Sequence, residues 1–181
     1  MKKVVLILSE GYEELEAISV IDILRRAGVT LEVVGVGDTN ITGAHGVTMV
    51  CDDVYEYYGM LDFDGVVLVG GMQNATTLSQ DESVIRLIQE YVSCGKMVAG
   101  ICATPALVFS EAGILEGRRA TCYPSDSLVS QLGMSYVDEA CVVDDNIITS
   151  QSPDTALEFA LTIVEYLGYN ASAVYSDLQG K

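Results

Sequence analysis

The chain has 181 residues, a formal net charge of −17, and hydrophobic residues at half of its positions. This length suits one domain, over residues 1–181, with a sizeable core. The excess of acidic residues disfavours nucleic acid and anionic membranes as partners, because like charges repel. The alternative is that the acidic residues only keep the protein soluble. No stretch approaches the roughly 20 uncharged apolar residues of a membrane span.

The first part of the chain is predicted to alternate strands and helices. The apolar run at residues 3–8 predicts a strand that is buried on both faces. A helix is expected over residues 13–27, because acids open it and Gly28 follows it. A second strand is expected over residues 30–36, and turn residues predict a hairpin over residues 38–51.

The alternation continues to the end of the chain, which predicts an α/β fold with a mainly parallel sheet and helices on both faces. Ligands of such sheets bind at the carboxyl ends of the strands. The remaining expected elements are a strand at 65–69 ending on Gly70 and Gly71, a helix at 82–93, a strand at 96–101, a helix from Pro105, a short strand at 120–122, a hairpin at 142–149 and a helix at 154–167. No structure is assigned to residues 169–181.

The five cysteines have irregular spacings and form no CxxC motif. This pattern argues against a disulfide framework and against a zinc knuckle, so we expect free thiols in a reducing cytoplasm and no metal. A GxGxxG motif and a P-loop are also missing, so we expect no nucleotide or flavin cofactor.

Cys102 stands where the strand at 96–101 meets the helix that opens at Pro105. Thr104 is a good N-cap and proline is favoured at the first helical position, so Cys102 is expected beside the positive end of a helix. Backbone N–H groups there stabilise a thiolate, as in a nucleophile elbow with cysteine in place of serine. A small buried thiol at a tight turn is the alternative.

Glu16 is expected on an apolar stripe of the first helix, together with Val20, Ile23 and Leu24. Burial there would raise the pKa of its carboxyl and favour the protonated form, which can exchange a proton with a thiol or a substrate. A solvated first-turn acid that stabilises the helix end is the alternative. The same helix is apolar nearly all round, which indicates a second buried face and a homodimer contact.

His45 is the single histidine, and no histidine follows Cys102. A Cys-His-acid triad needs a histidine beside the thiol, so hydrolysis of peptides or amides by a triad is disfavoured. A thiolate at Cys102 with Glu16 as proton carrier can instead add to reactive carbonyls such as 2-oxoaldehydes. The N–H groups at Ala103, Gly70 and Gly71 are expected to hold the oxyanion.

Four segments in this order resemble the ThiJ/PfpI superfamily, in the branch that contains the Parkinson-disease protein deglycase and glyoxalase III-like proteins. They are Glu10-Gly-Tyr-Glu-Glu-Leu-Glu16, Val69-Gly-Gly71, Gly100-Ile-Cys102-Ala-Thr-Pro105, and the run from Ser152 that reads Ser-Pro-Asp-Thr-Ala-Leu-Glu-Phe-Ala-Leu. The resemblance covers almost the whole chain. It implies a flavodoxin-like three-layer sandwich, a homodimer, and a functional pair of Cys102 and Glu16.

The resemblance also implies a cofactor-free glyoxalase, or a deglycase acting on 2-oxoaldehyde adducts, with a cysteine that oxidises to a sulfinic acid. A redox-sensing stress protein or chaperone with little catalysis is the alternative. The chain departs from the family pattern on the rim of the expected pocket. Thr104 replaces a glycine, Ala103 replaces the histidine of protease-like relatives, Tyr123 replaces a histidine of deglycase relatives, and His45 falls about where they carry arginine.

Overall fold

A seven-stranded sheet forms the centre of the computed structural model, which describes residues 1–181 apart from the side chain of Tyr58. The strand order is β5-β2-β1-β6-β7-β9-β8, and every neighbouring pair is parallel except β8 with β9. The strands are β1 (Lys3–Leu8), β2 (Thr30–Gly35), β5 (Asp53–Val54), β6 (Gly65–Leu68), β7 (Met97–Ile101), β8 (Cys141–Asp144) and β9 (Ile147–Ser150). The predicted mainly parallel sheet is confirmed.

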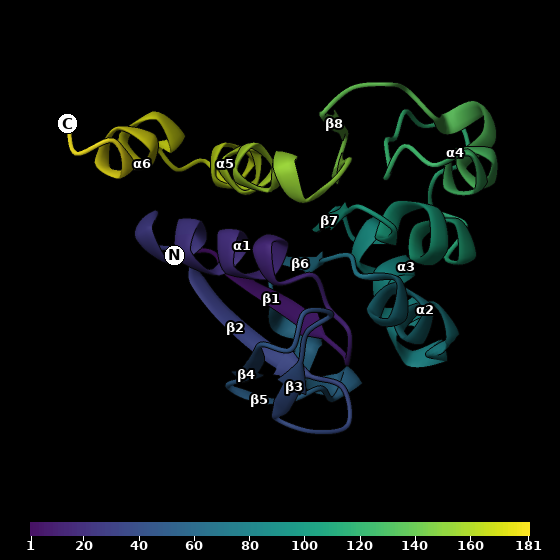
Figure 1. The fold of residues 1–181 in the computed structure, drawn as a ribbon, viewed down its shortest axis with the longest axis horizontal. Coiled ribbons are helices and arrows are strands. Elements are labelled where there is room, and N and C mark those ends of the chain that lie inside the picture. Colours follow the sequence, from purple (N-terminus) through teal and green to yellow (C-terminus); the bar gives the residue numbers. More distant parts are fainter.

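Helices cover both faces of this sheet, so the molecule has three layers (Figure 1). One core packs α1 and α5 against alternate residues of β1, such as Leu6, and the other packs α2, α3 and α4 against residues such as Ile7. The helices are α1 (Glu14–Arg26), α2 (Met72–Gln80), α3 (Glu82–Ser93), α4 (Asp126–Leu132), α5 (Ala156–Tyr166) and α6 (Ala171–Leu178). The architecture is flavodoxin-like.

Short elements complete the fold. The predicted hairpin at 38–51 is present as β3 (Asn40–Thr42) and β4 (Thr48–Val50), which pair only with each other. Short 3-10 helices are η1 (Tyr57–Asp62), η3 (Gly133–Ser135) and η4 (Pro153–Thr155), and η2 (Pro105–Phe109) is a π-helical turn.

Two predictions about the second half of the chain need correction. The expected strand at 120–122 makes only an isolated bridge from Ala120 to Tyr136, because the N–H of Thr121 donates instead to the Thr149 hydroxyl at 2.9 Å. The unassigned residues 169–181 contain α6, whose Asn170 caps the helix by accepting from the N–H of Ala173 at 3.0 Å.

The fold brings three connections to one edge of the sheet. β1, β6 and β7 are neighbours and run parallel, so their carboxyl ends lie side by side. The loop after β1 leads into α1, the loop after β6 leads into α2, and the loop after β7 carries Cys102. Every helix within the described residues is too short or too polar to cross a membrane.

Candidate active site

Cys102 occupies a strained turn directly after β7. Its φ is 65°, and only one other non-glycine residue in the described chain, Asp145 in the β8–β9 turn, has a positive φ. This conformation costs an L-residue roughly 1–2 kcal/mol and persists where surrounding contacts impose it. Here the Cys102 N–H donates to the Ser150 carbonyl at 3.0 Å, and its carbonyl accepts from the Tyr123 N–H at 2.9 Å. The backbone has the expected elbow geometry.

Thr104 does not cap the helix after the elbow. It has helical backbone angles and is buried, and its hydroxyl donates to the Val69 carbonyl at 2.8 Å. The N-cap prediction for Thr104 is therefore wrong, because a backbone acceptor at the end of the neighbouring strand β6 takes its hydroxyl. Burial also places Thr104 behind the pocket rather than on its rim.

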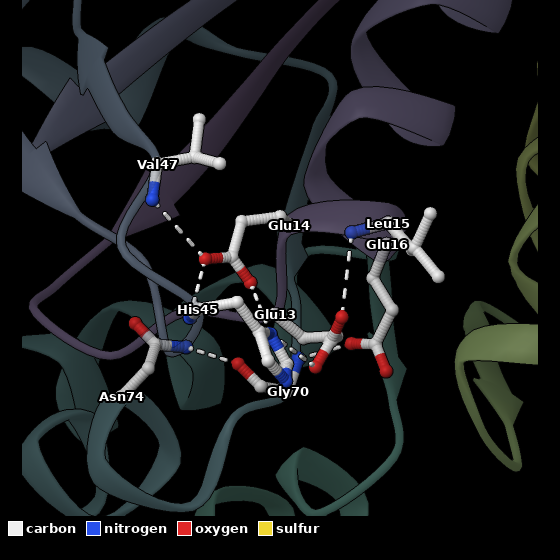
Figure 2. Close-up of polar contacts among 8 residues, drawn as sticks. All are labelled: Glu13, Glu14, Leu15, Glu16, His45, Val47, Gly70 and Asn74. Atoms are coloured by element: carbon white, nitrogen blue, oxygen red, sulfur yellow. Dashed lines mark hydrogen bonds and ion pairs between the residues drawn. The ribbon is translucent and has the colours of Figure 1, made fainter.

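Glu16 is fully buried on the first turn of α1. Its Oε2 accepts from the N–H of Gly70 at 2.6 Å, as Figure 2 shows, while its Oε1 has no hydrogen-bond partner. Burial raises the pKa of this carboxyl to about 8, although the Gly70 hydrogen bond acts to lower it. The sequence left open whether Glu16 is buried on the apolar stripe or solvated at the helix end, and in the structure it is buried.

The Cys102 thiol lies against the Glu16 carboxyl. Burial raises the pKa of Cys102, a negative charge on Glu16 raises it further, and the N–H groups of Gly71 and Ala103 act to lower it. When Glu16 is protonated, its repulsion of a thiolate is absent. The pair can therefore pass one proton between sulfur and carboxyl, with the thiolate held by the two N–H groups.

The three backbone groups expected to form an oxyanion hole have different partners. The N–H groups of Gly71 and Ala103 are directed to the Cys102 sulfur. The N–H of Gly70 is occupied by Glu16, so Gly70 serves the acid instead of an incoming oxyanion. Gly71 has a φ of 88°, and a Cβ there would lie 2.1 Å from the Gly11 carbonyl oxygen, so only glycine fits.

A pocket of about 460 Å³ opens beside Cys102, and Tyr123 lies on it with 44% of its surface exposed. Sequence reasoning missed the polar wall that Ser125 and Ser127 form at the start of α4, although Ser125 followed by Asp126 is a helix-start signal. The lining residues are Glu13, Ala44, Gly71, Met72, Cys102, Ala103, Tyr123, Ser125, Ser127, Leu128 and Pro153.

His45 lies beside this pocket and binds Glu14 of α1 (Figure 2). Its Nδ1 is 2.7 Å from Glu14 Oε2 and 3.8 Å from Glu13 Oε2, and its N–H donates to Glu14 Oε1 at 2.6 Å. The hydrogen bond with Glu14 raises the pKa of His45. Burial acts to raise the pKa of Glu14, but hydrogen bonds from His45 and Val47 lower it overall.

Glu13, Glu14 and His45 offer ligand atoms within 4.8 Å of one another. Both oxygens of Glu14 already accept hydrogen bonds from the hairpin, so we interpret the group as an anchor for residues 43–47 and not as a metal centre. The anchor holds Ala44 against the pocket through a further hydrogen bond, from its N–H to the Tyr12 carbonyl at 2.8 Å.

The other four cysteines lie away from the pocket lining. All five are free, and Cys94 at the end of α3 is exposed. Burial raises the pKa of Cys51 and of Cys122 to about 11. Cys102 alone combines an elbow, a pocket and an acidic partner.

An elbow cysteine at the carboxyl end of a parallel strand, paired with a buried glutamate, defines a class of cysteine-centred flavodoxin-like proteins. Residues 2–166 match the family model described as the DJ-1/PfpI family, and the chain belongs to that family. It is 38% identical over 168 residues to Protein dj-1beta of Drosophila melanogaster, covering 92% of this chain and 89% of that protein. The predicted family and fold are confirmed.

Solved structures agree closely with the fold. The crystal structure of Drosophila melanogaster DJ-1beta superposes with a TM-score of 0.92 at 35% identity, covering 98% of this chain and 97% of that chain. Oxidized Toxoplasma gondii DJ-1 gives a TM-score of 0.92 at 29% identity, covering 99% and 98%. Protein DJ-1 homolog A of Arabidopsis thaliana is 37% identical over 161 residues, and the match takes in 87% of this chain but only 40% of that longer protein.

Proposed function

We propose that the protein is a cofactor-free glyoxalase or deglycase that acts on 2-oxoaldehydes or their adducts through Cys102 and Glu16. The observation that carries the proposal is the contact between a strained, pocket-lining thiol and a buried carboxyl whose pKa is about 8. An acid with a pKa near the working pH both accepts and returns a proton efficiently.

The reaction with methylglyoxal needs no second substrate except water. Glu16 takes the thiol proton, the Cys102 sulfur attacks the aldehyde carbon, and the carbonyl electron pair moves to oxygen as an alkoxide. The N–H groups of Gly71 and Ala103, which are directed to the Cys102 sulfur, are the donors that we propose to stabilise that alkoxide. Glu16 then returns its proton to the alkoxide, which gives a hemithioacetal and leaves Glu16 ionised again. As a carboxylate, Glu16 removes the proton from the former aldehyde carbon; that C–H electron pair forms a double bond to the neighbouring carbon, whose carbonyl pair moves to its oxygen. Glu16 delivers the proton to the neighbouring carbon while the hydroxyl proton of the first carbon passes to the neighbouring oxygen, so the first carbon is oxidised to a thioester and the second is reduced to an alcohol. The resulting thioester is hydrolysed to lactate and the free thiol.

The direct test is production of lactate from methylglyoxal by the purified protein without glutathione. Cys102→Ser is expected to lose at least about a hundredfold in kcat/KM, and Glu16→Gln a similar factor, because each removes a reacting group. Cys94→Ser, which changes an exposed cysteine far from the pocket, is the matched control and is expected to retain full turnover. Equal turnover by Cys102→Ser protein would contradict the proposal.

A redox-sensing or chaperone role with little catalysis is the second candidate. It is favoured by the position of Cys102, a partly exposed residue with backbone N–H donors at its sulfur, and by the fact that one similar structure is described as oxidized DJ-1. Peroxide would convert the thiolate to sulfenic and then sulfinic acid, and each step is a two-electron oxidation. Mass spectrometry after mild peroxide is expected to find Cys102 oxidised ahead of Cys94. Oxidation of the exposed Cys94 first would count against this role.

A homodimer remains part of the proposal. Leu15 and Ile18 on α1 are 64% and 50% exposed, and Val50 of β4 is 74% exposed. Ile18 and Val50 line the same depression, together with apolar side chains and the ion pair of Arg25 with Asp52, and Leu15 lies one turn from Ile18 on α1. Ile18→Glu is expected to give monomers in light scattering, whereas Val143→Glu, at an equally apolar exposed position on β8, leaves the mass unchanged. A wild-type protein that is already monomeric at micromolar concentration would refute the dimer.

We also propose a cytoplasmic location. Five free cysteines, of which Cys94 is exposed, suit a reducing compartment. The observation that supports this is the lack of any disulfide among the cysteines of the described chain. Fractionation of the native cells, with the protein followed by antibody, tests it.

A further inference from the structure

A buried amide lies behind the candidate active site, in the first turn of α2. Asn74 has no exposed surface, and all of its side-chain polar atoms are bound. Its Oδ1 accepts from the N–H of Ser9 at 2.7 Å and from the Ser9 hydroxyl at 3.0 Å. Its Nδ2 donates to the carbonyls of Val69 at 2.8 Å and Gly70 at 3.1 Å. One side chain thus ties the end of β1 to the end of β6.

A third strand joins this network through Thr104. Its hydroxyl donates to the same Val69 carbonyl at 2.8 Å, so both lone pairs of that oxygen are used. Ser9 follows β1, Val69 follows β6, and Thr104 follows β7. When every buried polar group in such a network has a hydrogen-bond partner, the loops are held in one conformation. Any other conformation would leave a buried donor or acceptor without a partner.

The network acts on the site through a single peptide group. The Val69 carbonyl and the Gly70 N–H belong to the same planar trans peptide and point in opposite directions. Asn74 and Thr104 hold the oxygen, and the N–H on the other side donates to Glu16 Oε2 at 2.6 Å (Figure 2). Any rotation of this plane that releases the oxygen also turns the N–H away from Glu16.

We propose that Asn74 and Thr104 are positioning residues that aim the Gly70 N–H at Glu16 and so fix the carboxyl against Cys102. This inference adds detail to the proposed function. It depends on that function in one respect, that Cys102 and Glu16 are the reacting pair. It also gives the threonine at position 104 a role, because its hydroxyl reaches the Val69 oxygen.

The experiment compares variants of Thr104 and Asn74 with a matched control. Thr104→Val deletes the hydroxyl and keeps the branched shape, Thr104→Ser restores a hydroxyl, and Asn74→Ala deletes the amide. Asn146→Ala is the matched control, because Asn146 is also buried and donates to two backbone carbonyls, of Val92 and Lys96, at the opposite end of the sheet. All deletions are expected to lower stability, so stability alone does not separate positioning from structure.

Two measurements distinguish a positioning role of Thr104 and Asn74 from a purely structural role. In ¹⁵N NMR spectra, the Gly70 amide proton is expected to move upfield in Thr104→Val and Asn74→Ala, and to stay in place in Thr104→Ser and Asn146→Ala. In the pH profile of Cys102 alkylation, the inflection contributed by Glu16 is expected to rise by about half a unit or more, because the Gly70 N–H lowers the pKa of Glu16. The titratable groups facing Glu16 are Glu13 and Cys102, which none of these variants changes.

The proposal is overturned if Thr104→Val and Asn74→Ala move the Gly70 amide and the inflection no more than Asn146→Ala does. It is also overturned if Thr104→Ser fails to restore the wild-type profile, or if wild type and Glu16→Gln show the same inflection. Failure of the proposed function gives a different result. In that case wild-type protein makes no lactate, while the Gly70 amide still responds to Thr104 and Asn74.

Discussion

Glu16 and Cys102 meet across Gly70. A Cβ added to Gly70 would lie 2.9 Å from Glu16 Oε2 and 3.0 Å from Cys102 Sγ. The acid comes from the helix after β1, the thiol from the turn after β7, and the glycine from the loop after β6, the strand between β1 and β7. The contact between acid and thiol therefore depends on a position without a side chain.

Gly70→Ala is expected to separate the pair. The backbone at this position tolerates alanine, because Gly70 is not among the glycines with positive φ, so the effect is steric. Overpacking of this kind typically costs about 1–3 kcal/mol of stability, and turnover of methylglyoxal is expected to fall at least about a hundredfold. Gly59→Ala is the control, since nothing lies within 4 Å of its Cβ position. Comparable activity in both variants would show that the close approach is unimportant.

Glu16→Gln is expected to change how stability depends on pH. The pKa of Glu16 rises from 4.5 to about 8 on folding, so the folded state favours the proton. Stability from this group is therefore fully present below about pH 4.5 and declines as pH rises to about 8. The loss is at most about 4–5 kcal/mol at 1.36 kcal/mol per unit.

The measurement is urea unfolding of both proteins at pH 5 and pH 8.5. The wild type is expected to lose more stability between the two than Glu16→Gln, which cannot ionise. Glu111→Gln, a change at an exposed acid, controls for removal of one negative charge. Parallel pH dependence in wild type and Glu16→Gln would show that Glu16 is not a buried acid with a raised pKa.

Much of the fold was predictable from local pattern. Buried parallel strands read as continuous apolar runs, and β1, β6 and β7 fall within about a residue of the expected ranges. α2 was missed because its sequence, Met-Gln-Asn-Ala-Thr-Thr-Leu-Ser-Gln, buries few apolar residues and carries no clear helical stripe. Its burial comes from tertiary contacts with α3 and η2, which no local pattern records.

In the candidate site, too, some residues could be recognised from local sequence pattern and others depend on partners far away in the chain. Cys102 and Glu16 could be singled out because a thiol stands at a strand-to-helix turn and an acid stands on an apolar stripe, but local pattern left a core thiol and a solvated acid open as alternatives. Asn74 was not, because its amide partner Ser9 is 65 positions away and a polar residue in a polar segment looks exposed. Thr104 was assigned as a cap because the Val69 oxygen that takes its hydroxyl is 35 positions away.

The pKa of His45 is expected to lie above the usual value for a histidine. Its hydrogen bond and ion pair with Glu14 favour the charged imidazole, so the pKa of His45 is raised from 6.5. As the chain's single histidine, it gives one readily assigned NMR signal. Glu14→Gln is expected to lower the midpoint clearly, and Glu13→Gln by less, since Glu13 Oε2 lies 3.8 Å away against 2.7 Å for Glu14 Oε2. The reverse order would refute this geometry.

The charge of the pocket predicts a substrate preference. Glu13 is the one charged side chain that lines the pocket among the described residues, and its side chain is only 13% exposed. A carboxylate there repels 2-oxoaldehydes that carry a negative charge, such as 4,5-dioxopentanoate, and leaves uncharged ones such as methylglyoxal unaffected. Like-charge repulsion of about 1–2 kcal/mol at a partly screened site corresponds to roughly a tenfold change in kcat/KM.

Glu13→Gln is therefore expected to raise kcat/KM for 4,5-dioxopentanoate, an anionic 2-oxoaldehyde, roughly tenfold relative to that for methylglyoxal. Glutamine keeps the side-chain oxygen that accepts from the Leu15 N–H, so the start of α1 is preserved. Glu10→Gln removes the same charge from the same loop without touching the pocket lining, and is expected to leave the ratio unchanged. A ratio that shifts equally in both variants would assign the preference to net charge, and one that shifts in neither would remove Glu13 from substrate selection.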